Sequence, residues 1–305
     1  MTDAMHIQIA LKAAPEAIFA ALTERLPGWF AEHADVSLDS RRYDFWGRFT
    51  PETPDRAAGY HPLLAVEPNA RLRYAWTLNG VPTEVEYRLV AQPSGTRLIV
   101  THGRETESHA LGTFSFEDFW FLSLENLRRH LDGRAPVFCD FSTLPETGDV
   151  RHTVEIDGSR AAAFEALIRP EQMNRWIASH ARVDPRPGGD YDYGWNGIPP
   201  FKILEIVPDE KLSFTWPEDG DNTVVTWTLE ESGGKTRLTI VHSGFAPGKP
   251  NRGVQAGWLN FASWVRSIVE YGDDWLPAIL RIAPEMTSYY AASIGTAQSD
   301  LIPSP

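Results

Sequence analysis

The chain carries one sequence pattern twice, 140 residues apart. When residues 64–102 are aligned with residues 204–242, 12 of 39 ungapped positions are identical. Average residue usage would give about two or three identities by chance. The pattern ends on a histidine in both copies, His102 and His242. A self-match of this length predicts two copies of one module, and this constrains the fold more than any local motif.

The length of the chain agrees with this interpretation. A chain of 305 residues accommodates two domains of about 130–150 residues, each large enough for its own core. We therefore expect a first domain over residues 1–135, a second over 150–275 and a tail over 276–305. Scattered apolar residues in the tail predict one short helix followed by disorder; they are Leu276, Ile279, Leu280 and Ile282.

Charge and cysteine content exclude several classes of protein. The net charge of −13 opposes nonspecific binding to nucleic acid or to anionic membranes, which requires a basic surface. No segment approaches the roughly 20 apolar residues of a membrane span, and the first ten residues lack the pattern of a secretory signal. The single cysteine, Cys139, excludes an internal disulfide. We expect a cytoplasmic protein with no nucleic-acid or membrane partner.

The second copy has the clearer secondary-structure signals. Residues 152–156 alternate as a strand, Ser159 is placed to cap a helix, and Pro170 is suited to open a second one. Arg186-Pro-Gly-Gly189 predicts a turn. Further strand-like runs and a closing helix follow at 191–195, 201–207, 212–216, 223–229 and 236–243, and at 257–271.

Alternation along these strands places apolar side chains on one face and Ser or Thr on the other, as in a sheet with one covered side. The first copy follows the same order, with a strand at 7–11 and a closing helix at 116–131. We therefore predict an α+β fold of two domains, each a curved antiparallel sheet around a long C-terminal helix.

Several motifs of the second module resemble the AHSA-like family, relatives of the activator of the heat-shock-protein ATPase within the SRPBCC or START-like superfamily. They are Arg186-Pro-Gly-Gly-Asp-Tyr191, residues 204–216, residues 225–229, residues 236–244 and Gly257-Trp258. The first module is more divergent, because residues 40–46 replace the glycine turn. The resemblance implies a helix-grip fold, with a cavity between sheet and helix that holds apolar ligands and in a minority of members supports a reaction.

Aromatic and histidine side chains on the predicted inner faces are the candidate ligand-binding residues: Trp76, Tyr87, His102, Tyr191, Tyr193, Trp216, Trp227, His242 and Trp258. Aromatic rings can form the wall of an apolar pocket, and indole N–H, phenol and imidazole groups would give it polar contacts. The alternative is that the rings fill a solid core. Each histidine would then bond to backbone or to an acid on the closing helix.

No sequence signature points to a metal, a cofactor or a catalytic residue. HExxH, paired cysteines, G-x-S-x-G and a Walker loop are all absent. The acidic segment 219–222 lacks the terminal glutamate of a calcium loop and is interpreted as a hairpin loop. We expect no cofactor.

Three functional hypotheses follow. The first is binding of a small apolar or amphipathic ligand in a helix-grip cavity, without a defined reaction. The second is a protein-interaction role in the stress response, with a chaperone or another protein as partner. The third is a cyclase- or hydrolase-type enzyme, which would need a second ionisable group within hydrogen-bond reach of His242.

Overall fold

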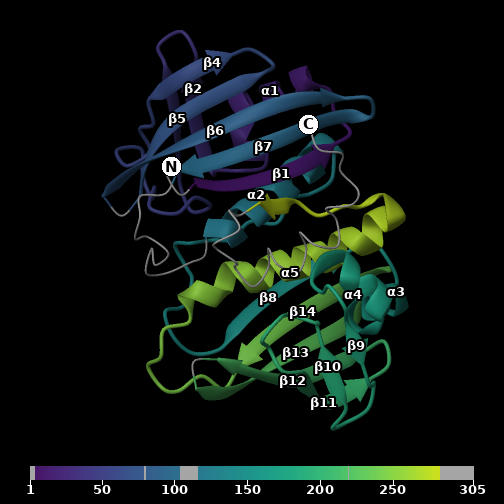
Figure 1. Cartoon of the computed structure of the whole chain (residues 1–305). Coiled ribbons are helices and arrows are strands. Elements are labelled where there is room, and N and C mark those ends of the chain that lie inside the picture. Colours follow the sequence, from purple (N-terminus) through teal and green to yellow (C-terminus); the bar gives the residue numbers. More distant parts are fainter. Residues whose placement is uncertain (1–3, 79, 104–115, 219, 282–305) are drawn as a thin grey trace. The chain divides into compact units, whose positions relative to one another are not determined.

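Two compact units make up the structure, a computed structural model that describes residues 4–78, 80–103, 116–218 and 220–281 (Figure 1). Unit 1 runs to Leu144 and also includes Ala278–Arg281, whereas unit 2 spans Pro145–Pro277. The chain therefore leaves unit 1, forms unit 2 and then returns to unit 1.

Unit 1 has a six-stranded antiparallel sheet in the order β15-β1-β7-β6-β5-β4 and a separate hairpin, β2-β3. In chain order its elements are β1 (Ala4–Leu11), α1 (Pro15–Thr23), the 3-10 turn η1 (Leu26–Gly28), β2 (His33–Ser37), β3 (Arg42–Trp46), β4 (Leu63–Glu67), β5 (Arg71–Leu78), β6 (Val81–Gln92), β7 (Gly95–Gly103), α2 (Phe116–Leu131) and β15 (Ile279–Arg281). A bridge between Arg42 and Pro62 joins the hairpin to the segment before β4.

Unit 2 repeats this arrangement in one seven-stranded sheet, in the order β8-β14-β13-β12-β11-β10-β9. Its elements are β8 (Val150–Ile156), α3 (Arg160–Ile168), α4 (Pro170–Trp176), β9 (Arg182–Val183), β10 (Asp190–Asp192), β11 (Phe201–Val207), β12 (Lys211–Glu218), β13 (Asp221–Ser232), β14 (Lys235–Ser243), α5 (Arg252–Tyr271) and the 3-10 turn η2 (Gly272–Asp274). The two units thus confirm the predicted α+β, helix-grip fold.

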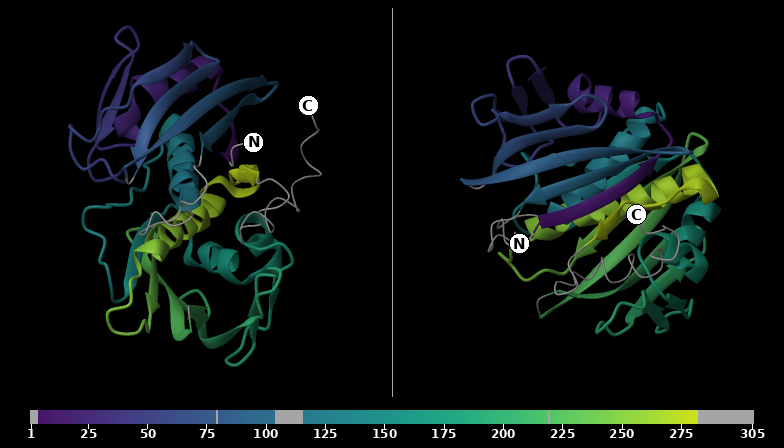
Figure 2. Two further views of the ribbon diagram at one scale, coloured as in Figure 1. Left: turned by 60° about the vertical axis from the view of Figure 1, so that its left-hand side comes forward. Right: turned by 45° about the horizontal axis from the view of Figure 1, so that its top comes forward.

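The long helix of each unit covers the inner face of that unit's sheet (Figure 2). Helix α5 packs on β8 and β14, and α2 packs on β1. Burial follows the predicted alternation of the strands. In β5, for example, Leu72, Tyr74, Trp76 and Leu78 are all buried, whereas the residues between them are partly or fully exposed. Each inner face is therefore apolar and rich in aromatic rings.

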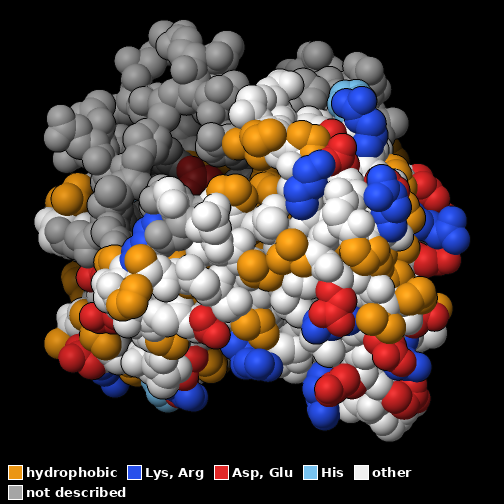
Figure 3. All heavy atoms as spheres, turned by 90° about the horizontal axis from the view of Figure 1, so that it is seen from below, with side chains coloured by type: hydrophobic (Ala, Val, Ile, Leu, Met, Phe, Trp, Pro, Cys, Tyr) orange, Lys and Arg blue, Asp and Glu red, His pale blue; other side chains and the backbone are white. Residues whose placement is uncertain are grey.

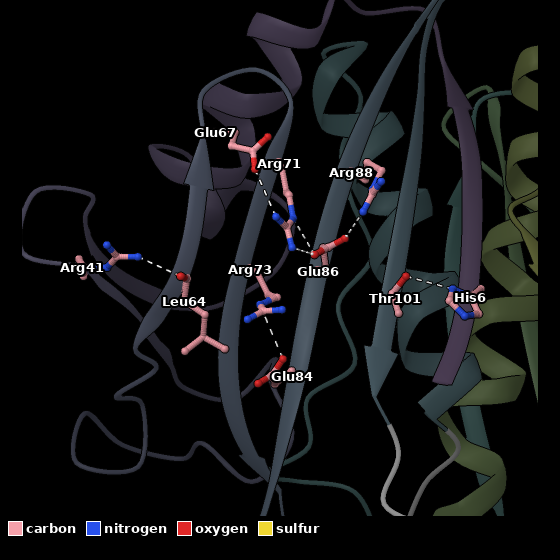
Figure 4. Close-up of polar contacts among 10 residues, drawn as sticks. All are labelled: His6, Arg41, Leu64, Glu67, Arg71, Arg73, Glu84, Glu86, Arg88 and Thr101. Carbon is pink, nitrogen blue, oxygen red and sulfur yellow. Dashed lines mark hydrogen bonds and ion pairs between the residues drawn. The ribbon is translucent and has the colours of Figure 1, made fainter. Parts of the chain in front are cut away.

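The outer face of the unit 1 sheet is polar and is connected by ion pairs across the strands (Figure 4). Arg71 of β5 contacts Glu86 of β6 at 2.6 Å and Glu67 of β4 at 3.2 Å. Arg88 contacts the same Glu86 at 2.9 Å. Exposed pairs of this kind contribute little stability, but they keep this face solvated and leave the opposite face as the place where apolar surface is buried.

Local sequence signals account for the entry into unit 2. The Ser159 hydroxyl accepts the backbone N–H of Ala162 at 3.2 Å and caps α3, and Pro170 occupies the first turn of α4. The predicted glycine turn is present. A Cβ on Gly189 would lie 2.1 Å from the carbonyl oxygen of Asp184, so only glycine fits there.

Two predictions about element boundaries were wrong. The run at 191–195 forms a strand only to Asp192, because Gly194 has a positive φ of 70° and donates its N–H to the Asp192 carboxylate. The tail helix predicted around Ile279 is instead strand β15, which pairs with β1 through His6–Gln8. The rest of that tail prediction, from residue 282 onward, lies outside the described residues. Among the residues described, no helix is long and apolar enough to cross a membrane.

Strand β15 should contribute to the stability of unit 1. Leu280 pairs with Ile7 and is 4% exposed, whereas Leu276 is 51% exposed. We expect Leu280→Ala to lower the free energy of unfolding by about 2 kcal/mol, the low end of the range for a buried leucine. Leu276→Ala is the matched control and should change it by less than about 0.5 kcal/mol. Urea denaturation measures both values, and equal effects of the two substitutions would contradict the assignment.

Candidate functional site

A histidine at the end of β7 joins three elements of unit 1. The Trp120 indole N–H on α2 donates to His102 Nδ1 at 3.1 Å. On the other side of the ring, His102 Nε2 lies 2.8 Å from the hydroxyl oxygen of Thr83 on β6. That hydroxyl donates to the main-chain oxygen of Trp76 on β5 at 2.7 Å. One continuous chain of hydrogen bonds therefore links the long helix to three of the strands beneath it.

Unit 2 repeats this chain with equivalent residues. The Trp258 indole N–H on α5 donates to His242 Nδ1 at 2.9 Å, and His242 Nε2 lies 2.6 Å from the Thr223 hydroxyl oxygen. The Thr223 hydroxyl in turn donates to the main-chain oxygen of Trp216. His242 and Thr223 are 0% and 1% exposed. We call these two sets the Trp-His-Thr chains.

The donors fix the tautomer of each imidazole. An indole N–H can only donate, so Nδ1 of the histidine must be the accepting, unprotonated nitrogen. The proton is then on Nε2, which donates to the threonine oxygen, and the threonine proton goes to the carbonyl. Each of these buried groups is therefore satisfied, and both ring nitrogens of His242 are engaged within the fold.

The charge state of His242 agrees with this assignment. Burial lowers its pKa from 6.5 to about 4, because the imidazolium loses more hydration than the neutral ring. Protonation at Nδ1 would also point an N–H at the indole N–H of Trp258. The neutral ring is therefore held at physiological pH, and neither of its hydrogen-bond partners is an ionisable acid or base.

The other predicted site residues lie on the same inner faces. Eight of the nine are buried with at most 3% exposure, and Trp216 is partly exposed. In unit 1, Trp76 stacks on His102 at a centroid distance of 5.8 Å. In unit 2, Trp216 lies 4.8 Å from Trp258 and 6.4 Å from Tyr193. The structure thus brings the predicted residues of each unit together in one aromatic cluster.

Some polar groups of these clusters serve the fold. The Tyr191 hydroxyl donates to the main-chain oxygen of Leu167 at 2.6 Å, and Tyr43 of unit 1 donates to Leu22 in the same way at 2.7 Å. Burial raises the pKa of both phenols. Tyr43 lies in the segment that replaces the glycine turn, so unit 1 keeps this tie between sheet and first helix without that turn.

Other buried polar atoms make no hydrogen bond within the described part of the chain. They include the indole nitrogens of Trp76 and Trp227, both 0% exposed, and both ring nitrogens of His61, which is 1% exposed. The large majority of buried polar side-chain atoms in proteins have a partner, so each exception calls for an explanation. These atoms are the part of the inner faces that the fold itself does not use.

Sequence reasoning did not select His61. It lies just before β4, its ring is 4.0 Å from that of Phe45 and 6.0 Å from that of Trp76. Burial lowers its pKa to about 4, and the main chain of Phe45 offsets only part of this effect. The available signal was the repeat itself, because the position 140 residues later is Phe201.

No metal site emerges from this geometry. The described residues contain no group of three or more His, Cys, Asp or Glu side chains that could hold a metal ion.

The Trp-His-Thr chain of unit 2 can be tested with a nearly isosteric substitution. Thr223→Val would leave His242 Nε2–H without an acceptor and the Trp216 carbonyl without a donor, at a cost of about 2–3 kcal/mol. Thr239→Val is the matched control, because the Thr239 hydroxyl bonds only to Thr153 on the outer face. It should cost less than about 1 kcal/mol. Urea denaturation of both variants decides, and similar losses would contradict a special role of Thr223.

Stability should fall as the pH is lowered from 7 to 4. The pKa of His61 and of His242 is about 4 in the folded state and 6.5 when unshifted. The unfolded chain therefore binds protons first, and each ring removes up to about 3 kcal/mol over this interval. His61→Phe should flatten the dependence of the unfolding free energy on pH between 6.5 and 4. Parallel curves for wild type and variant would show that His61 is not buried in its neutral form.

Solved structures of several small proteins are similar to parts of this chain. The Aha1 dimer from Colwellia psychrerythraea is 18% identical, with 42% of this chain and 99% of that chain covered and a TM-score of 0.37. Protein MLL2253 from Mesorhizobium loti is 24% identical, with coverage of 41% and 98% and a TM-score of 0.36. DynU16, a putative protein of the dynemicin biosynthetic locus, is 17% identical, with coverage of 89% and 99% and a TM-score of 0.33. No curated protein matches the chain.

A family model matches both halves of the chain. The model described as "Activator of Hsp90 ATPase homolog 1-like protein" covers residues 12–132 and again residues 157–270. Each match contains one complete Trp-His-Thr chain. The protein therefore belongs to the AHSA1 family, of which it contains two domains in tandem.

Proposed function

We propose that this protein binds a small apolar or amphipathic ligand between the inner face of the sheet and the long helix of each unit. One observation carries the proposal. Each inner face contains a buried indole N–H without an acceptor in the described part of the chain, Trp76 in unit 1 and Trp227 in unit 2. A buried, unsatisfied donor costs about 1–3 kcal/mol. An oxygen atom of a bound ligand would remove this cost.

The surroundings of these indoles suit an apolar ligand. Trp76 contacts the rings of Phe45, His102 and Phe119 at centroid distances of 5.2–5.8 Å. Trp227 lies 6.4 Å from Trp258. Ligand sites in proteins are mostly apolar, with a few polar groups that orient the ligand. The two inner faces have this composition.

A binding role agrees better with the histidines than a catalytic one. Both nitrogens of His242 are held by Trp258 and Thr223, and its pKa of about 4 keeps the ring neutral at pH 7. A general acid or base is most effective when its pKa lies near the working pH. His242 therefore serves in this proposal to position Trp258 and the strands around the ligand.

A charged docking surface receives less support than a ligand site. On the face of the molecule shown in Figure 3, acidic and basic side chains are interspersed and apolar ones are scattered. Protein partners that bind by charge complementarity meet a patch of one sign. We therefore place the binding function on the inner faces rather than on that surface.

Filling an inner face should abolish binding to that unit. Val225 and Val85 are fully buried and pair directly with His242 and His102, whereas Val224 and Val90 lie on the outer faces of the same strands. We expect native mass spectrometry of the wild-type protein, purified without detergent, to show a mass excess that disappears on denaturation. Val225→Phe and Val85→Phe should each remove the ligand of one unit, because a larger ring occupies its space.

Val224→Phe and Val90→Phe are the controls, and circular dichroism verifies that all four variants fold. The controls should retain the full mass excess. A wild-type protein that carries no ligand and binds none from a panel of apolar compounds at 100 µM would contradict the proposal. Retention of the ligand in both inner-face variants would contradict its location.

A further inference from the structure

We propose that unit 1 selects ligands that carry an uncharged hydroxyl or carbonyl oxygen, and that Trp76 and His61 bind this oxygen. This inference rests on the proposed function and names the chemistry of the ligand in one of the two units. It starts from the three polar nitrogens of unit 1 that are buried side by side without hydrogen-bond partners, Nε1 of Trp76 and both ring nitrogens of His61.

The two side chains are neighbours within one aromatic cluster. Their ring centroids are 6.0 Å apart, and the planes meet at 67°. Phe45 covers one face of His61 at 4.0 Å and contacts Trp76 edge to face at 5.2 Å. A ligand group that reaches one of these rings is therefore close to the other, in surroundings made of aromatic carbon.

The nearby polar groups already have partners. Tyr43 donates to the main-chain oxygen of Leu22, and the hydroxyls of Tyr74 and Tyr87 lie 3.5 Å apart. His102 is held by Trp120 and Thr83. The cluster thus separates into groups that the fold uses and the His61–Trp76 pair, which it does not use.

The chemistry of the pair specifies an uncharged oxygen. The indole N–H only donates, whereas a neutral imidazole offers one donor and one acceptor. A hydroxyl can accept from Trp76 and donate to His61, and a carbonyl can accept from both. A carboxylate or an ammonium group would need a compensating charge to enter this apolar cluster. Burial is the main influence on the pKa of His61, and no charged neighbour contributes to it.

Unit 2 lacks this pair. Leu63 pairs with Tyr74 as Ile203 pairs with Phe214, so His61 and Phe201 hold the same position relative to their sheets. Phe201 stacks on Trp216 at 4.7 Å and brings no polar atom. The two units of one chain therefore differ in the polarity of their inner faces, and we expect them to differ in the ligands they prefer.

Four ten-carbon compounds test the inference, because they share a chain and differ in the head group: 1-decanol, 2-decanone, decanoate and decylammonium. We expect isothermal titration calorimetry of the wild-type protein at pH 7 to show a site that prefers the alcohol and the ketone. His61→Phe introduces the residue of unit 2 and should fold. It should weaken binding of both neutral compounds by about tenfold, the contribution of one neutral hydrogen bond.

His6→Phe is the control, because His6 bonds to Thr101 on the polar outer face of the same sheet (Figure 4). It should leave all four affinities unchanged. The reciprocal variant Phe201→His should strengthen binding of decanol to a second site. Binding without a head-group preference, or a preference that survives in His61→Phe, would overturn the inference and leave the proposed function intact. A wild-type protein that binds none of the four compounds would overturn both.

Discussion

The hydrogen bond between an indole N–H of the long helix and a neutral imidazole of the last strand is the contact on which each unit depends. Aromatic and aliphatic contacts hold a helix on a sheet but specify its position weakly, because they are not directional. The bonds from Trp120 to His102 and from Trp258 to His242 are directional and lie in a dry environment. They fix the rotation of the helix and thereby decide which side chains face the sheet.

The same contact separates structure from function on the inner faces. A histidine at a strand end in an aromatic surrounding suggests acid-base chemistry, but here its two nitrogens complete a chain of donors and acceptors. The polar atoms that remain available are elsewhere, on Trp76, Trp227 and His61. The buried groups without partners, rather than the most conspicuous histidines, are therefore the basis of the ligand-binding proposal.

The repeat predicted the fold, and local patterns predicted most elements, because alternation and capping are local properties. The Trp-His-Thr chain was not predicted as a unit, although Thr83 and Thr223 stand among the repeat identities. Its third member lies 18 residues after His102 in one copy and 16 after His242 in the other, so an ungapped comparison does not align Trp120 with Trp258. Strand β15 and the burial of His61 depend on contacts distant in sequence, which no local pattern contains.

The indole protons provide the most direct test of the account, since NMR resolves them individually and their exchange with solvent reports hydrogen bonding. The account predicts that the indole protons of Trp120 and Trp258 are protected from exchange both with and without ligand. Those of Trp76 and Trp227 should exchange faster in ligand-free protein and become protected when an apolar ligand is bound. If a ligand binds and leaves the exchange of Trp76 and Trp227 unchanged, the inner faces are not the binding site.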